Sequence, residues 1–230
     1  MDRDASRPRG GEMTPGMKLA VPERRSTSRH LTVYRTARMR IGNVQRLILV
    51  KNLSAGGLKA RVYEAVPVGS AICVELTGDN RIDGMVVWAD PPHIGVRFDR
   101  EIDVSEVLNP PFMASPAAER LRFPLLDIPT TGVLRCSQES ASVAVHSVAT
   151  TGARFVWPAL RCEEDMFLEV SGLDNHRGHI LWQGEGMAEI GFFRPIAFAT
   201  LAQWAVARQP LDVPLTVANG EPPLQQYLTA

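Results

Sequence analysis

The second half of this 230-residue chain repeats the pattern of its first half. Three segments recur at a separation of 94 to 96 residues. They are residues 50–60 with 145–155, residues 84–88 with 178–182, and residues 94–98 with 190–193. A nearly constant separation indicates a duplicated domain, and the unit is too long for a solenoid repeat. The chain is therefore expected to hold two similar domains in tandem.

Each unit is predicted to be a small barrel of short strands. Alternating or continuous apolar runs are separated by turn residues, which is typical of strands rather than long helices. Gly42-Asn43 stands between two such runs and predicts a two-residue hairpin turn. The strands expected in the first unit are residues 30–41, 47–50, 58–63, 71–76, 81–88 and 94–98.

These patterns indicate an all-β fold, with two tandem small antiparallel β-barrels of about six strands each and short flanking helices. The helices are expected at residues 104–108 and 198–208, where apolar residues recur at helical spacing. The predicted division is a flexible tail at 1–21, a first barrel at 22–108, a linker at 109–117, a second barrel at 118–209 and a C-terminal tail at 210–230.

The charges of the chain are unevenly distributed. Its formal net charge is zero, yet residues 23–62 carry ten Arg or Lys and a single acid, Glu23. This segment is therefore +9 and the remainder is −9. A local excess of this size favours an anionic partner. Most of the cations are arginines, which contact phosphates in bidentate fashion and stack on planar rings.

Several other classes of protein are disfavoured by the sequence. Cys73, Cys136 and Cys162 are scattered, so we expect buried small residues and neither a disulfide framework nor a zinc site. The five histidines form no metal-binding motif, and no nucleophile or phosphate-loop signature occurs, so we expect no enzyme and no cofactor. No apolar run is long enough to span a membrane and no apolar segment opens the chain, so we expect neither a membrane span nor a signal peptide and a cytoplasmic location.

Two short motifs lie 23 residues apart in the basic segment. Arg25-Ser-Thr-Ser-Arg29 precedes the first apolar run, and Asn52-Leu-Ser54-Ala-Gly-Gly57 follows a predicted strand. The first supplies two guanidinium groups, which suit phosphates and guanine edges. The second supplies an amide, a hydroxyl and a backbone without a side chain. Together they can hold a small anionic ligand with planar hydrogen-bonding rings.

This pair of motifs resembles the PilZ domain, a bacterial receptor module for cyclic di-GMP. The resemblance covers about residues 22–100 and is supported by Gly84-x-x-x-Trp88 and by residues 95–98. It implies that a mobile arginine loop folds over the ligand and that the barrel holds the other guanine. The ligand-binding residues it implies are Arg24, Arg25, Arg29, Asn52, Ser54, Gly57 and, by its place four residues after Gly57, Arg61.

The second unit departs from this motif. Ser147 and Ala149 replace the Asn and Ser of the first unit, and Gly152 alone persists. We therefore expect a degenerate PilZ-like domain without the ligand site. Because Trp182 recurs in this unit at the place of Trp88, both tryptophans are expected to pack in a core.

The sequence leaves three functions open. The first is a non-catalytic cyclic di-GMP receptor that changes inter-domain or partner contacts when it binds. The second is a protein-interaction adaptor with a vestigial nucleotide site. The third is a nucleic-acid-binding β-barrel, which is disfavoured because only Tyr34 and Tyr63 are aromatic in the basic segment. We expect cyclic di-GMP and a protein of unknown identity as partners and no DNA, and a homodimer is compatible with the sequence.

Overall fold

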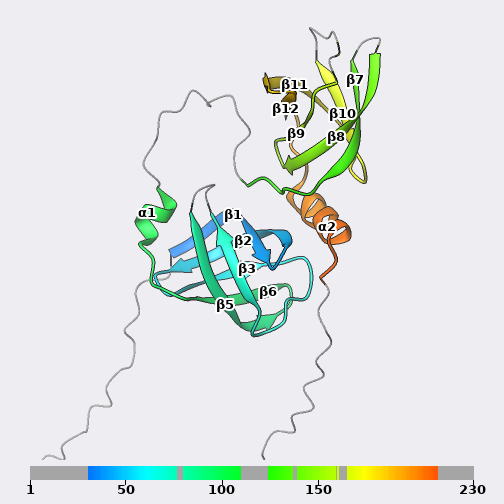
Figure 1. The fold of residues 1–230 in the computed structure, drawn as a ribbon. Coiled ribbons are helices and arrows are strands. Elements are labelled where there is room, and N and C mark those ends of the chain that lie inside the picture. Colours follow the sequence, from blue (N-terminus) through cyan, green and yellow to red (C-terminus); the bar gives the residue numbers. More distant parts are fainter. Residues whose placement is uncertain are drawn as a thin grey trace, which may run out of the picture.

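A computed structural model describes residues 31–76, 80–109, 124–136, 139–158, 160 and 165–211 of the chain. They form two closed antiparallel barrels of six strands each, which confirms the all-β expectation (Figure 1). The first barrel contains β1 (Leu31–Ile41), β2 (Val44–Ser54), β3 (Gly57–Arg61), β4 (Ala71–Glu75), β5 (Arg81–Asp90) and β6 (His93–Phe98), followed by α1 (Val104–Leu108). The second contains β7 (Thr130–Cys136), β8 (Glu139–Ala149), β9 (Gly152–Val156), β10 (Met166–Val170), β11 (Asn175–Gly184) and β12 (Met187–Phe192), followed by α2 (Phe198–Arg208).

The two barrels share one topology. The strands follow the order β1-β2-β3-β6-β5-β4 in the first and β7-β8-β9-β12-β11-β10 in the second. Both barrels also carry a β-bulge at the same place: between Val50 and Asn52 in the first, and between Val145 and Ser147 in the second. A shared bulge is a specific feature of the backbone, so the duplication predicted from the sequence is confirmed.

One of the three sequence matches has the wrong register. Strand β5 pairs Gly84 with Phe98, and β11 pairs Gly178 with Phe192. Residues 93–98 therefore correspond to 187–192 at a separation of 94 residues, and the predicted match of 94–98 with 190–193 is wrong by two. Side chains alternate with a period of two along a strand, so a two-residue shift preserves the inward and outward pattern and escapes a comparison of sequences.

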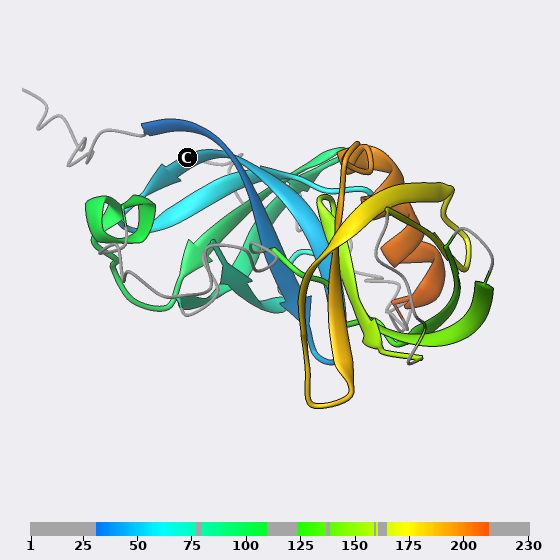
Figure 2. The ribbon, with the colours of Figure 1, turned by 90° about the horizontal axis from the view of Figure 1, so that it is seen from above.

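The hairpin predicted at Gly42-Asn43 is present between β1 and β2. Ile41 pairs directly with Val44, and Gly42 has a φ of 57°, a backbone conformation that glycine adopts without steric cost. Both strands are eleven residues long. β1 is paired with β4 as far as Arg40, whereas β2 pairs with β3 only from Leu49 onward, so the first residues of β2 have no partner on β3, and this end of the hairpin lies near the second barrel (Figure 2).

Each barrel encloses its own apolar core. The first core includes Ile48, Val50, Val74 and Val96, and Val107 of α1 packs against it. The second core includes Phe155, Leu168 and Ile190, and α2 adds Leu201 and Trp204. The two helices occupy corresponding places in the duplicated units, with bounds as predicted from the sequence. No helix in the described part of the chain is long and apolar enough to span a membrane.

The cysteines differ from expectation. Cys136, at the end of β7, is buried as expected, but it is disulfide-bonded, so the expectation that the cysteines form no disulfide is wrong at this position. Cys73 is a free thiol, and burial together with a hydrogen bond to Asp83 raises its pKa to about 11. Cys162 lies outside the described residues. Scattered spacing in a sequence does not reveal which strand ends and loops a closed barrel brings together.

Candidate functional site

Three of the predicted ligand residues meet at the β2–β3 hairpin. Asn52 is half-buried on β2, Ser54 ends β2, and Gly57 begins β3. The hydroxyl of Ser54 donates a hydrogen bond to the carbonyl oxygen of Gly57 at 3.1 Å and so closes the turn. A hydroxyl oxygen keeps acceptor capacity when it donates, so Ser54 can still accept a hydrogen bond from a ligand.

Gly57 is needed by the barrel itself. A Cβ atom at this position would lie 2.3 Å from the carbonyl oxygen of Val96 on β6. Any other residue would push β3 away from β6, where Gly57 pairs with Arg97. The resemblance implied that this glycine lets the backbone come close to a ligand. In the structure, the backbone at Gly57 comes close to the neighbouring strand β6.

A row of side chains runs outward across the sheet from Asn52. Lys59 of β3 pairs with Asn52 and with Gly95 of β6, and Gly95 pairs with Trp88 of β5. The Lys59 ammonium lies 5.4 Å from the centroid of the Trp88 ring, which is a cation–π distance. We call these four residues the Asn52 row. The row offers an amide, a cation and an aromatic face on one surface.

Trp88 is not a core residue, so its predicted packing role is wrong. Its side chain is 39% exposed, whereas Val86, two residues earlier, is fully buried. Simple alternation would place both on the same side, but a β-bulge between them turns Trp88 outward. The indole lies directly over Gly95: a Cβ at this position would be 1.8 Å from the indole nitrogen, so only glycine leaves room for the ring.

Positive charge extends along the same face. Burial lowers the pKa of His93, and the charges of Lys51, Lys59 and Arg61 lower it further, while Asp90 opposes them. His93 pairs with Arg61 of β3, whose guanidinium lies 5.4 Å from the centroid of the Tyr63 ring. Cations that disfavour a protonated imidazole also favour an anion at this surface.

The predicted site residues thus divide into two groups. The structure brings together Asn52, Ser54 and Gly57 and puts Arg61 on the outer face of β3, as its spacing from Gly57 predicted. The predicted Arg24, Arg25 and Arg29 lie outside the described residues. The sequence reasoning missed Lys59, although its place midway between Gly57 and Arg61 on one strand was the available signal.

The corresponding row of the second barrel has a different chemistry. It consists of Ser147, Arg154, Glu189 and Trp182, which pair across β8, β9, β12 and β11 in the same way. Arg154 donates two hydrogen bonds to Oε1 of Glu189, from Nε at 2.9 Å and from Nη2 at 2.7 Å. Glu189 is fully buried and Ser147 is 2% exposed. A carboxylate therefore already neutralises the cation of this row, which supports the interpretation of a degenerate barrel.

Comparison with known proteins agrees with this geometry. Residues 23–108 match the sequence model of the PilZ domain family. The first barrel is a PilZ domain. The match includes every strand of that barrel and ends with α1. The tandem arrangement is thus a PilZ domain followed by a second barrel of the same topology.

Similar solved structures include three proteins of low sequence identity. PlzA of Borreliella burgdorferi in complex with c-di-GMP is 12% identical, with 76% of this chain and 88% of that chain covered and a TM-score of 0.32. The inhibitor of motility MotI/DgrA of Bacillus subtilis is 10% identical, with 78% of this chain and 98% of that chain covered and a TM-score of 0.30. YcgR of Escherichia coli in complex with c-di-GMP is 8% identical, with 75% of this chain and 82% of that chain covered and a TM-score of 0.29. At these TM-scores the likeness carries no conclusion about this chain. Among curated proteins, none matches the chain.

Proposed function

We propose that this protein is a non-catalytic receptor for cyclic di-GMP and that the ligand binds the outer face of the PilZ barrel. The observation that carries the proposal is the β2–β3 hairpin, where Asn52 and Ser54 lie beside a cationic surface. The ligand has two phosphates and two guanines, so it needs cations and planar hydrogen-bonding groups close together.

The proposed roles follow from the chemistry of each residue. Asn52 and Ser54 hydrogen-bond one guanine, and Gly57 keeps the backbone of the hairpin open to it. Arg61 and Lys59 face the phosphates, and Trp88 offers a ring on which a base can stack. Arg24, Arg25 and Arg29 close over the ligand from the segment that precedes β1. Ordering of that segment changes the surface offered to a protein partner.

Titration calorimetry with purified protein tests the proposal directly. We expect a dissociation constant for cyclic di-GMP near or below about 1 μM, which corresponds to about −8 kcal/mol, and no measurable binding of GMP. Asn52→Ala and Arg25→Ala should each weaken binding at least about tenfold, as expected when a charged or paired hydrogen bond is lost. Ser147→Ala, at the corresponding place in the second barrel, is the matched control and should bind as the wild type does.

A specific observation also favours a second candidate, single-stranded nucleic acid. The exposed Trp88 beside Lys59 is the combination of aromatic ring and cation that such proteins use. A fluorescent oligonucleotide that binds more tightly than cyclic di-GMP, with a steep dependence on salt, would favour this candidate. Absence of binding to either ligand would favour an adaptor with a vestigial site. A cytoplasmic location stays a prediction.

A further inference from the structure

The tip of the β1–β2 hairpin contacts the segment that leads into the second barrel. Nη1 of Arg38 donates hydrogen bonds to the carbonyl oxygen of Leu125 at 2.8 Å and to Oδ2 of Asp127 at 2.6 Å. The Nε of the same guanidinium donates to Oε2 of Glu75 at 2.7 Å, and Glu75 is fully buried. Arg38 therefore joins a buried carboxylate of the PilZ barrel to two acceptors of the second barrel.

Gln45, on the other strand of this hairpin, links both ends of the second barrel. Its backbone N–H donates to Oε1 of Gln209 at 2.8 Å, just after α2. Its side-chain Oε1 accepts a hydrogen bond from the backbone N–H of Asp127 at 2.9 Å, just before β7. Gln45 is only 7% exposed. The residues that precede the second barrel and those that follow its last helix are thus held by one side of the hairpin.

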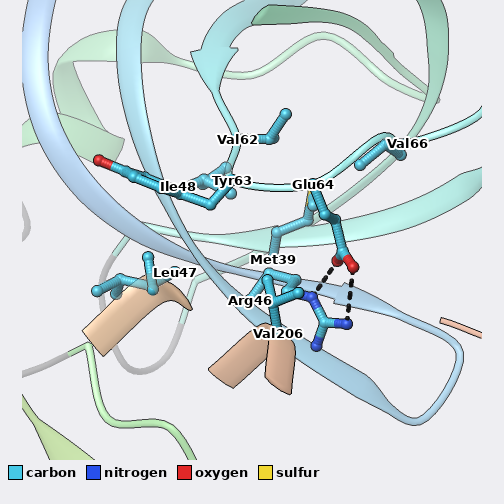
Figure 3. Close-up of a pocket in the computed structure, with 10 residues that line it drawn as sticks. Met39, Arg46, Leu47, Ile48, Val62, Tyr63, Glu64, Val66 and Val206 are labelled. Atoms are coloured by element: carbon cyan, nitrogen blue, oxygen red, sulfur yellow. Dashed lines mark hydrogen bonds and ion pairs between the residues drawn. The ribbon is translucent and has the colours of Figure 1, made fainter. Parts of the chain in front are cut away.

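The neighbouring Arg46 forms a buried ion pair at the same junction. It donates from Nη2 to Oε2 of Glu64 at 3.2 Å and from Nε to Oε1 of Glu64, and its Nη2 also donates to the carbonyl oxygen of Gln209. Figure 3 shows the two side chains pointing toward one another beside Val206 of α2. If α2 moved away, this buried guanidinium would lose an acceptor that it now has.

Apolar contacts complete the junction. Leu47 of β2 is 2% exposed and packs in the core of the second barrel rather than in that of its own. The ring of Tyr63 lies 5.8 Å from that of Phe198, the first residue of α2. Ala202 and Val206 face the same end of the PilZ barrel. One side of α2 therefore seals the second core, and another side covers the PilZ barrel (Figure 1).

We propose that the second barrel is a fixed internal partner of the PilZ barrel and that the two keep one relative orientation without and with ligand. Domains joined by small, wet interfaces are expected to move. Here motion would remove one or more acceptors from Arg38, from Arg46 and from the Gln45 amide, would remove the donor to the Gln45 side chain, and would expose Leu47, which is unfavourable. The statement about the bound state rests on the proposed function. It follows that the signal leaves through the ligand-covered face of the PilZ barrel and not through a swing of the second barrel.

Residual dipolar couplings of backbone amides, measured on the full chain, test this proposal. We expect one alignment tensor to fit both barrels in the free protein and again with saturating cyclic di-GMP. Separate tensors in the free protein, or a relative orientation that changes with ligand beyond the error of the fit, would overturn it. If the amide resonances of Asn52 and Trp88 do not shift with cyclic di-GMP, the proposed function fails, while the free protein still decides whether the barrels are fixed.

A pair of substitutions tests which contacts hold the junction. Leu47→Ser combined with Gln209→Ala removes the inserted side chain and the acceptor of the Gln45 amide. We expect two tensors to become necessary, with both barrels still folded and amide shifts confined to the surroundings of residues 47 and 209. A single tensor in this variant would show that these contacts do not hold the barrels. The matched control is Val68→Ser with Glu101→Ala, two exposed residues of the PilZ barrel that have no place in the junction.

Discussion

Glu189 of the second barrel occupies the position that Gly95 holds in the PilZ barrel. Each is the cross-strand partner of the bulge-following tryptophan, Trp182 in one barrel and Trp88 in the other. In the PilZ barrel this position lies beneath an indole and beside Lys59, which forms no ion pair with any residue that the structure describes. In the second barrel it carries a carboxylate that accepts two hydrogen bonds from Arg154. The residue at this one position therefore distinguishes the two surfaces. With glycine the PilZ surface can accept an external anion, and with glutamate the second barrel provides the negative charge itself.

We expect Glu189→Gln to destabilise the second barrel by about 1–3 kcal/mol, because glutamine keeps an oxygen acceptor but loses the buried negative charge that strengthens both hydrogen bonds from Arg154. Urea unfolding of the full chain measures this change. The matched control is Glu169→Gln, whose ion pair with Arg135 is about half exposed on both sides, so its cost should be below about 1 kcal/mol. Equal effects of the two substitutions would contradict the structural role of Glu189.

Gly57→Ala should destabilise the PilZ barrel by about 1–3 kcal/mol, the range for overpacking against backbone. The new Cβ would lie 2.3 Å from the carbonyl oxygen of Val96. At Gly56, the preceding residue, a Cβ would meet no atom within 4 Å. Gly56→Ala should therefore change the free energy of unfolding by less than about 0.5 kcal/mol. Thermal or urea unfolding compares the two, and a neutral Gly57→Ala would rule out the steric argument.

Trp88→Ala should weaken cyclic di-GMP binding by about 1–3 kcal/mol, the usual contribution of one base stacked on an aromatic ring. Calorimetry gives the affinity, and amide resonances of the PilZ core check that the variant is folded. Trp182→Ala removes the corresponding ring in the second barrel and should leave the affinity unchanged. Similar losses for both variants would indicate that the tryptophans act through folding and not through the ligand.

The pKa of His93 should rise when the ligand binds. In the free protein, burial and the nearby cations hold this pKa below its ordinary value of 6.5. The unfolded chain therefore binds more protons between these two pKa values, and His93 makes the folded state less stable as the pH falls through this window. An anion near Lys59 and Arg61 offsets their charge, so proton uptake should accompany binding in mildly acidic solution.

NMR titration of the His93 ring with and without cyclic di-GMP measures this shift. The same titration of Asn52→Ala, at a ligand concentration too low to bind the variant, serves as the control. A His93 pKa that is the same in the free and saturated wild-type protein would mean that the phosphates lie elsewhere.

Much of the architecture could be predicted from the sequence. Alternating apolar residues, the Gly42-Asn43 turn and the recurring segments predicted two barrels, and both helices begin and end where helical spacing of apolar residues does. The hairpin motif Asn52-x-Ser54-x-x-Gly57 marked one end of β2, and the PilZ match includes it. Local patterns determine these features because the backbone conformation of a strand, a turn or a short helix depends mainly on neighbours in the chain.

The tertiary structure alone decided the remainder. The bulge before Trp88 reversed the side on which its indole lies, and the true register of β12 differed by two residues from the sequence match. The insertion of Leu47 into the second core and the contacts of Arg38 with Asp127 join segments far apart in the chain. A pattern of period two is unchanged by a two-residue shift and carries no information about a bulge. Contacts between distant segments depend on packing and hydrogen bonds that exist only once both barrels are formed.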